Sequence, residues 1–131
     1  MKVISITENH LYSKVYAKGK KFVTPTVVVY VLVDYRAARF RKQNPEKKFI
    51  NRVGLTVTKK NGGAVTRNRS KRVLREALRS VESHHKLRTG FLIVLVARDA
   101  TAVSKSTAVA SDLSRAFSKL GMLSPLPQEN K

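Results

Sequence analysis

Apolar residues recur every three or four positions in three stretches of the chain, which is the spacing of a helix with one buried face. In the first stretch Leu11 and Val15 lie four apart and Thr7 stands where a helix N-cap is expected. Gly19 follows where a helix commonly ends in a residue of positive φ. The pattern therefore predicts a short helix over residues 7–18.

The second and third helical stretches are longer. "TRNRSKRVLREALRSVE", Thr66 to Glu82, places its apolar residues on one side of a helix: Val73, Leu74, Ala77, Leu78 and Val81. The last stretch begins near Ser104 and ends at Gly121. Its apolar stripe comprises Val109, Leu113, Ala116, Phe117 and Leu120. We predict one helix in each stretch.

The remaining apolar segments have the composition of strands. "TVVVYVLVDY" (26–35) is rich in β-branched residues, "NRVGLTVTKK" (51–60) alternates apolar with small or polar positions, and "FLIVLVA" (91–97) indicates a strand buried on both faces. A basic loop over 36–48 separates the first two. The order α-β-β-β-α-β-α predicts a single-domain α/β (α+β) sandwich with a mixed sheet over residues 1–121, followed by a flexible tail over 122–131.

Charge narrows the class of partner. The chain has 27 Lys and Arg residues against 8 Asp and Glu, a formal net charge of +19. A compact domain with this charge repels itself unless a polyanion neutralises it, so we expect a nucleic acid partner. An anionic membrane is the competing partner, but the apolar stripe opposite the charge is ordinary core material without large anchors.

The basic residues concentrate on the helix predicted within 66–82. On its wheel, Arg72, Arg75 and Arg79 lie within about 40° of Asn68, opposite the apolar stripe. Glu76 is the one acid between Lys59 and Arg79, so internal ion pairs cannot balance this face, although a merely solvated face is the alternative. The basic density near the helix amino end favours phosphate binding, because free backbone N–H groups and arginine forks both suit phosphate oxygens.

The sequence lacks the marks of an independent enzyme. It contains no cysteine, no Gly-x-Ser-x-Gly or Walker pattern, and its carboxylates are scattered. His84 and His85 are adjacent, so they diverge on a helix and form a poor metal pair. The amino-terminal segment lacks a signal-peptide pattern and no apolar run is long enough to span a bilayer. We expect a soluble, cytoplasmic protein with no membrane partner.

The segment "NRVGLTVTKKNGGAVTRNRSKRVLREALR" closely resembles the signature of the bacterial ribonuclease P protein subunit, and the resemblance covers residues 5–121. It implies the protein component of an RNA-based endonuclease that removes the 5′ leader from precursor tRNA. In that family the RNA subunit holds the catalytic Mg²⁺ ions and cuts the phosphodiester, so no catalytic residue is expected in this chain. One protein per RNA and a left-handed β-α-β crossover are also implied, although parallel crossovers are usually right-handed.

The resemblance also implies which residues bind RNA. The residues expected to contact the catalytic RNA are Arg67, Asn68, Arg69, Lys71, Arg72 and Arg75. The leader would lie in a cleft lined by Tyr12, Tyr16 and Tyr30, with Lys14 and Arg67 near its phosphates. Tyr30 is equally compatible with a core position in its strand. The alternative function is a structural or assembly RNA-binding protein such as a ribosomal component. The predicted first helix carries two tyrosines beside lysines. This pattern favours a cleft that binds single-stranded RNA, and hence the ribonuclease P hypothesis.

Overall fold

The computed structural model describes residues 4–6, 9–33, 51–58, 60, 62–87 and 90–124. Its elements, in chain order, are β1 (Ile4–Ser5), α1 (Asn9–Lys18), β2 (Lys20–Val23), β3 (Val27–Val33), β4 (Arg52–Thr56), α3 (Ala64–His84), β5 (Lys86–Leu87), β6 (Phe91–Ala97), α4 (Ser106–Lys119) and β7 (Leu123–Ser124). The expected order α-β-β-β-α-β-α is confirmed, with β1, β5 and β7 as additional two-residue strands. Three of its four strands fall in the segments located from the sequence, and β2 is the fourth. The predicted N-cap at Thr7 and the basic loop over 36–48 lie outside the described residues.

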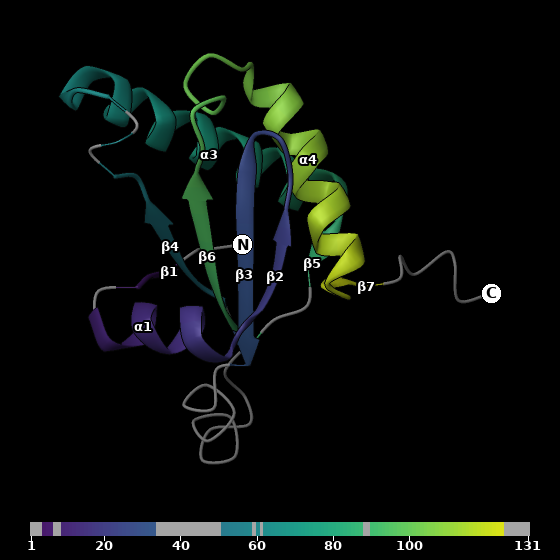
Figure 1. The fold of residues 1–131 in the computed structure, drawn as a ribbon. Helices are drawn as coiled ribbons and strands as arrows, with labels where there is room; N and C mark the ends of the chain where they lie inside the picture. The colour runs from purple at the N-terminus through teal and green to yellow at the C-terminus, as the bar shows by residue number, and fades with distance from the viewer. Residues whose placement is uncertain are drawn as a thin grey trace.

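The main sheet is mixed, as expected. Its strand order is β1-β4-β6-β3-β2, and β1, β4 and β6 run parallel to one another. β3 is antiparallel to both β6 and β2. Figure 1 shows β6 and β3 at the centre of this sheet, which explains why "FLIVLVA" is apolar at every position.

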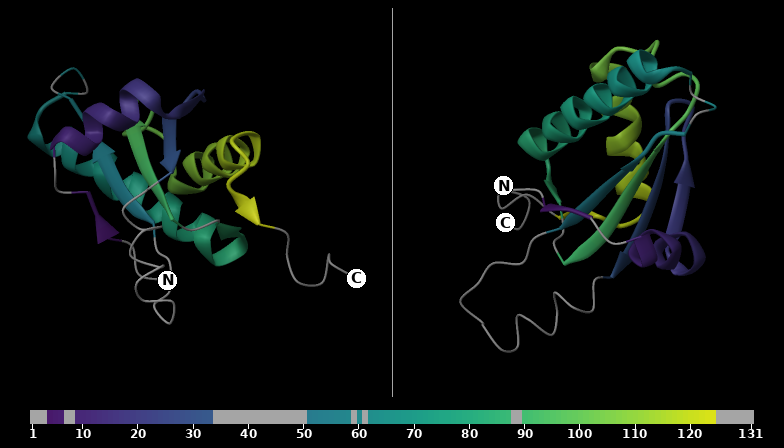
Figure 2. Two further views of the ribbon diagram at one scale, coloured as in Figure 1. Left: turned by 90° about the horizontal axis from the view of Figure 1, so that it is seen from below. Right: turned by 90° about the vertical axis from the view of Figure 1, so that its left-hand side faces the viewer.

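Helices cover both faces of the sheet (Figure 2, right). α3 and α4 pack on one face, where they share the larger hydrophobic cluster with alternate residues of β3, such as Val27 and Val29. α1 lies on the other face, where Val15 packs with Leu92 and Val94 of β6. Because each fully buried aliphatic side chain contributes about 1.5–3 kcal/mol, these two clusters supply the main drive for folding.

The connection from β4 to β6 through α3 is left-handed. In Figure 1 both strands point the same way, α3 passes behind the sheet, and β6 lies to the right of β4. A right-handed connection would place α3 in front, on the face that α1 covers. The structure therefore has the hand that the family resemblance implied, against the general preference for right-handed crossovers.

Gly19 does not have the positive φ that the sequence suggested. Close approach requires glycine there instead, because a Cβ would lie 2.5 Å from the carbonyl oxygen of Val15 and 3.0 Å from that of Val31. A helix end of this kind occurs instead at Gly121, which follows α4 with φ of 74°.

The ordered fold extends past residue 121. Met122 is only 1% exposed and belongs to the larger hydrophobic cluster. Leu123 then pairs with Leu87 in the small β5–β7 sheet. These contacts place residues 122–124 within the packed domain, whereas residues 125–131 of the expected tail lie outside the described residues.

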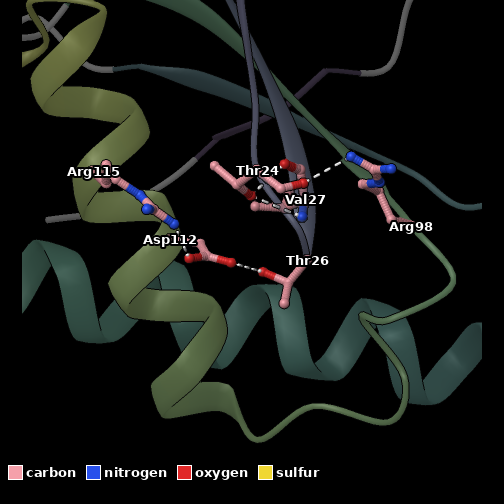
Figure 3. Close-up of polar contacts among 6 residues, drawn as sticks. All are labelled: Thr24, Thr26, Val27, Arg98, Asp112 and Arg115. Atoms are coloured by element: carbon pink, nitrogen blue, oxygen red, sulfur yellow. Dashed lines mark hydrogen bonds and ion pairs between the residues drawn. The ribbon is translucent and has the colours of Figure 1, made fainter.

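A polar network holds the turn between β2 and β3 against α4 and β6 (Figure 3). The Thr26 hydroxyl donates to Asp112 Oδ2 over 2.7 Å, and Arg115 Nη2 donates to Asp112 Oδ1 over 2.7 Å. Arg98 Nη1 donates to the Thr24 carbonyl oxygen over 2.9 Å. Because hydrogen bonds to charged groups are stronger than neutral ones, this network orients α4 on the sheet.

Candidate nucleic-acid interface

α3 presents one apolar and one basic face. The helix begins after Gly63, whose backbone is extended, and its predicted apolar stripe is buried in full: Val73, Leu74, Ala77, Leu78 and Val81. The residues expected on the opposite face are all exposed: Asn68, Arg72, Arg75 and Arg79. Arg69 is also exposed, whereas Arg67 and Lys71 are half-buried. The helical wheel therefore separated core from surface correctly.

The basic face is not neutralised from within. Among the described residues, no ion pair involves a basic side chain of α3, although Arg115 of α4 pairs with Asp112. Glu76 is the acidic residue of α3 that lies within one helical turn of Arg72 and Arg79, but it forms no ion pair with either. Arg69 Nε donates to the carbonyl oxygen of Ala102 over 2.7 Å, which fixes its position without cancelling its charge. A polyanion is the partner that such a surface favours.

Arg67 differs from the other arginines of α3. Its Nε atom is buried and has no hydrogen-bond partner within the described part of the chain. Its backbone N–H donates to the carbonyl oxygen of Gly63 over 2.9 Å and closes the first helical turn. Arg67 is therefore held at the amino end of α3 with an unsatisfied buried donor, a state that costs free energy until an acceptor is found.

Tyr16 and Tyr30 form an aromatic pair on the α1 face of the sheet. Their ring centroids lie 4.9 Å apart and their planes meet at 79°, an edge-to-face arrangement. Tyr16 is 40% exposed and Tyr30 is half-buried. The Tyr16 phenol oxygen lies 2.6 Å from Thr56 Oγ1 at the end of β4. The pair offers a partly exposed aromatic surface on a fixed support.

Tyr12 lies deeper than Tyr16. Its phenol donates to the carbonyl oxygen of Ile6 over 3.4 Å, and burial, together with the nearby Tyr16 phenol, raises the pKa of Tyr12. A Cβ on Gly54 would come within 2.6 Å of the Tyr12 ring, so glycine in β4 makes room for this side chain. Tyr12 thus forms part of the packed wall beside the exposed pair.

Two exposed lysines lie on elements that carry or adjoin the aromatic pair: Lys14 on α1 and Lys21 on β2. Lys14 is exposed on α1, and its expected role near the leader phosphates stays a prediction. Lys21 was missed, yet it is exposed and is the direct strand partner of Tyr30 in the β2–β3 register. Residues directly opposite each other on antiparallel strands share a face, so Lys21 and Tyr30 lie on the same side of the sheet. Lys21 and Tyr30 are far apart in the sequence and share no helical or strand periodicity. Only the pairing of β2 with β3 shows that they are neighbours.

The carboxyl end of β4 links the aromatic pair to the start of α3. Thr56, which contacts Tyr16, is the last residue of β4, and the chain reaches the amino end of α3 at Ala64. α1 and α3 cover opposite faces of the sheet, but the amino end of α3 extends past the end of β4 (Figure 1).

The described acids do not gather into a metal site. No group of three or more His, Cys, Asp or Glu side chains suited to a metal ion occurs among the residues that the structure describes. Four of the scattered carboxylates, Glu8, Asp34, Glu46 and Glu129, lie outside those residues. Within the same described ranges, no helix is long and apolar enough to cross a membrane.

The chain matches the family model described as Ribonuclease P over residues 1–121. It is 30% identical over 122 residues to a ribonuclease P protein component of Clostridium kluyveri, covering 93% of this chain and 98% of the relative. It is 37% identical over 111 residues to a ribonuclease P protein component of Gluconacetobacter diazotrophicus, covering 85% of each chain.

Solved structures share the fold. The structure of a Staphylococcus aureus RNase P protein has a TM-score of 0.70 at 24% identity, covering 94% of this chain and 100% of that one. An RNase P protein from Thermotoga maritima has a TM-score of 0.60 at 22% identity, covering 83% of this chain and 87% of that one. At these identities the likeness concerns the fold alone.

Proposed function

The chain belongs to the ribonuclease P protein family, and on that premise we propose that it is the protein subunit of ribonuclease P, the enzyme that removes the 5′ leader of precursor tRNA. On this proposal the RNA subunit holds the catalytic Mg²⁺ ions and cuts the phosphodiester. The protein contributes no reacting group; it binds RNA. We further propose that one protein acts with one RNA, in the cytoplasm.

One observation carries the proposal. The family match spans residues 1–121, and within it the exposed arginines of α3 have no ion-pair partner among the described residues. The like charges on the outer face of this helix repel one another, and this repulsion raises the free energy of the folded protein when no partner is bound. Binding to an RNA removes that cost and releases counterions from the RNA.

The basic face of α3 docks on the catalytic RNA in this proposal. The residues assigned to it are Asn68, Arg69, Lys71, Arg72 and Arg75, with Arg67 at the edge. Arginine forks pair with phosphate oxygens in two parallel hydrogen bonds, so contacts of this kind position the protein on the RNA backbone. They carry little base-sequence information. The RNA would be recognised mainly by shape and backbone path.

The leader binds at the aromatic pair. Tyr16 and Tyr30 offer ring surface on which an unpaired base can stack, and such stacking contributes about 1–3 kcal/mol per base. Tyr12 packs beside the aromatic pair and forms part of the wall of the site. Lys14 and Arg67 contact the leader phosphates in this proposal. Stacking is tolerant of base identity, which suits an enzyme that must process leaders of differing sequence.

The two contacts explain how a protein could aid a ribozyme. Catalytic RNA and precursor tRNA are both polyanions, so their association is opposed by repulsion that salt and Mg²⁺ screen. A chain of formal charge +19 placed between them reduces that repulsion. The leader contact adds affinity for the precursor that the mature tRNA, which has no leader, cannot share.

A binding comparison tests the proposal. The affinity of the protein for ribonuclease P RNA is measured beside its affinity for a ribosomal RNA fragment of equal length, over a range of salt concentrations. We expect tighter binding to ribonuclease P RNA that persists as salt rises, since non-specific binding rests on phosphate charge alone. Equal affinities and equal salt slopes for both RNAs would favour a general RNA-binding protein and overturn the proposal.

A further inference from the structure

An open pocket lies between α3 and the start of α4, away from the aromatic pair. Its volume is about 440 Å³, within the range of pockets that hold small-molecule ligands. The lining residues from α3 are Arg69, Arg72, Val73 and Glu76, and those from α4 and the preceding loop are Ser104, Lys105, Ser106 and Thr107. The two sets are far apart in the sequence, so the helical wheel of α3 could not reveal the pocket.

The pocket is basic on both walls. Arg69 and Arg72 stand on the α3 side and Lys105 on the α4 side, against the single carboxylate of Glu76. None of these four residues forms an ion pair within the described ranges. Three cations and one acid leave a net charge of +2 in the pocket. Charge complementarity therefore favours an anionic group between the two helices.

The α3 wall is held in place before any ligand arrives. Arg69 Nε donates to the Ala102 carbonyl oxygen over 2.7 Å, so its two terminal nitrogens remain for another partner. Ala102 is buried, and its neighbour Thr101 is anchored by the backbone N–H of Arg98 and by the carbonyl oxygen of Thr26. A fixed guanidinium loses little conformational entropy when it binds, which favours affinity.

The α4 wall contributes backbone hydrogen-bond donors as well as the positive charge of Lys105. α4 has no acidic residue in its first turn, and Lys105 makes no side-chain capping hydrogen bond. The first backbone N–H groups of a helix lack acceptors within that helix, so those at Ser106 and Thr107 can donate to an anion. Ser104 is already engaged, because its hydroxyl donates to the Ala100 carbonyl oxygen over 2.7 Å.

We propose that this pocket binds a backbone phosphate of the catalytic RNA, with Arg69 and Arg72 on one side and Lys105 on the other. The inference rests on the proposed function and extends the RNA-docking surface from α3 to α4, where no contact was expected from the sequence. An RNA backbone fits better than a free phosphorylated molecule, because the same arginines continue into the exposed basic face of α3.

Lys105→Gln tests the inference, with Lys119→Gln as its matched control. Both lysines are exposed and on or beside α4, but Lys119 lies at the opposite end of the helix. We expect Lys105→Gln to weaken binding to ribonuclease P RNA about threefold to tenfold at moderate salt and to lower the salt slope by about one. Lys119→Gln should leave both values near wild type. Thermal unfolding of each variant checks that the fold is retained.

The outcomes separate this inference from the proposed function. If Lys105→Gln and Lys119→Gln bind the RNA alike, while Arg72→Ala with Arg75→Ala still weakens binding, the pocket is not an RNA contact and the inference is overturned. If the wild-type protein does not prefer ribonuclease P RNA, the proposed function fails and the inference fails with it.

A free phosphorylated ligand is tested directly. Inorganic phosphate is titrated into the protein while the amide signals of Ser106 and Thr107 are followed by NMR. Saturable shifts together with an unchanged RNA affinity in Lys105→Gln would assign the pocket to a small phosphorylated molecule and overturn the inference. Shifts that ribonuclease P RNA also produces, and that Lys105→Gln abolishes in both titrations, would support it.

Discussion

The phenol oxygen of Tyr16 lies 2.6 Å from Thr56 Oγ1, so the exposed tyrosine of α1 is tied to the last residue of β4. The same ring packs edge-on against Tyr30. Two independent contacts therefore hold Tyr16 while 40% of it remains exposed. A residue held in this way can offer a ring to a ligand without first being ordered.

Tyr16→Ala should weaken binding of precursor tRNA to the assembled enzyme by about 1–3 kcal/mol, because it removes the stacking surface. Tyr16→Phe keeps the ring and loses only the Thr56 hydrogen bond, so its effect should be much smaller. The measurement is the ratio of affinities for precursor and mature tRNA. Equal losses in the two variants would show that the hydroxyl, rather than the ring, carries the contact.

Gly54→Ala should destabilise the fold by about 1–3 kcal/mol, because its Cβ would approach the Tyr12 ring to 2.6 Å and overpack that site. Chemical denaturation measures the change in the free energy of unfolding. Combining Gly54→Ala with Tyr12→Ala should cost less than the sum of the two single changes, since the clash is then absent. Additive losses would contradict the direct contact.

Arg72→Ala with Arg75→Ala should weaken assembly with ribonuclease P RNA and lower the salt dependence of assembly, because two phosphate contacts are lost. Tyr16→Ala should leave assembly unchanged. Conversely, once saturated with RNA, the double arginine variant should retain the wild-type ratio of precursor to mature tRNA affinity. The assignment of two separate surfaces would be wrong if either variant altered both measurements equally.

Glu82 gives a prediction about pH. Burial raises the pKa of this carboxyl in the folded protein, so ionisation costs more in the folded state than in the unfolded one. The contribution of Glu82 to stability should be most favourable below its unfolded pKa, about 4.3, and should fall as pH rises through the folded pKa. Glu82→Gln should therefore unfold at a higher temperature than wild type at pH 7, and this advantage should shrink toward pH 4. An advantage that is constant from pH 4 to pH 7 would show that ionisation of Glu82 is not its source.

The sequence predicted those features that depend on periodicity alone. The apolar stripe of α3 and the placing of Val53 and Leu55 on one face of β4 follow directly from the geometry of a single element, and both are confirmed. The expected half-buried pattern of β4 is not found, because Gly54 on the opposite face is buried beneath the Tyr12 ring. Gly19 shows the limit of such reasoning. Its position after a helix suggested a positive φ, yet the reason for glycine is the carbonyl oxygen of Val31 on a different element.

Periodicity within one element could not predict contacts between residues of different elements. Lys21 becomes a neighbour of Tyr30 only through the register of β2 on β3. The pocket that contains Arg69 and Lys105 depends on how α3 packs against α4. The left hand of the β4–α3–β6 crossover contradicts the general rule, so only the family resemblance suggested it.

The most direct test of the central claim is the rate at which ribonuclease P RNA removes the 5′ leader from precursor tRNA at low Mg²⁺ and low ionic strength, with and without this protein. Repulsion between the two RNAs is least screened under these conditions, so the account predicts a large acceleration that diminishes as Mg²⁺ is raised. The protein alone should release no leader. An unchanged rate at every protein concentration, with RNA that is active at high Mg²⁺, would contradict the account.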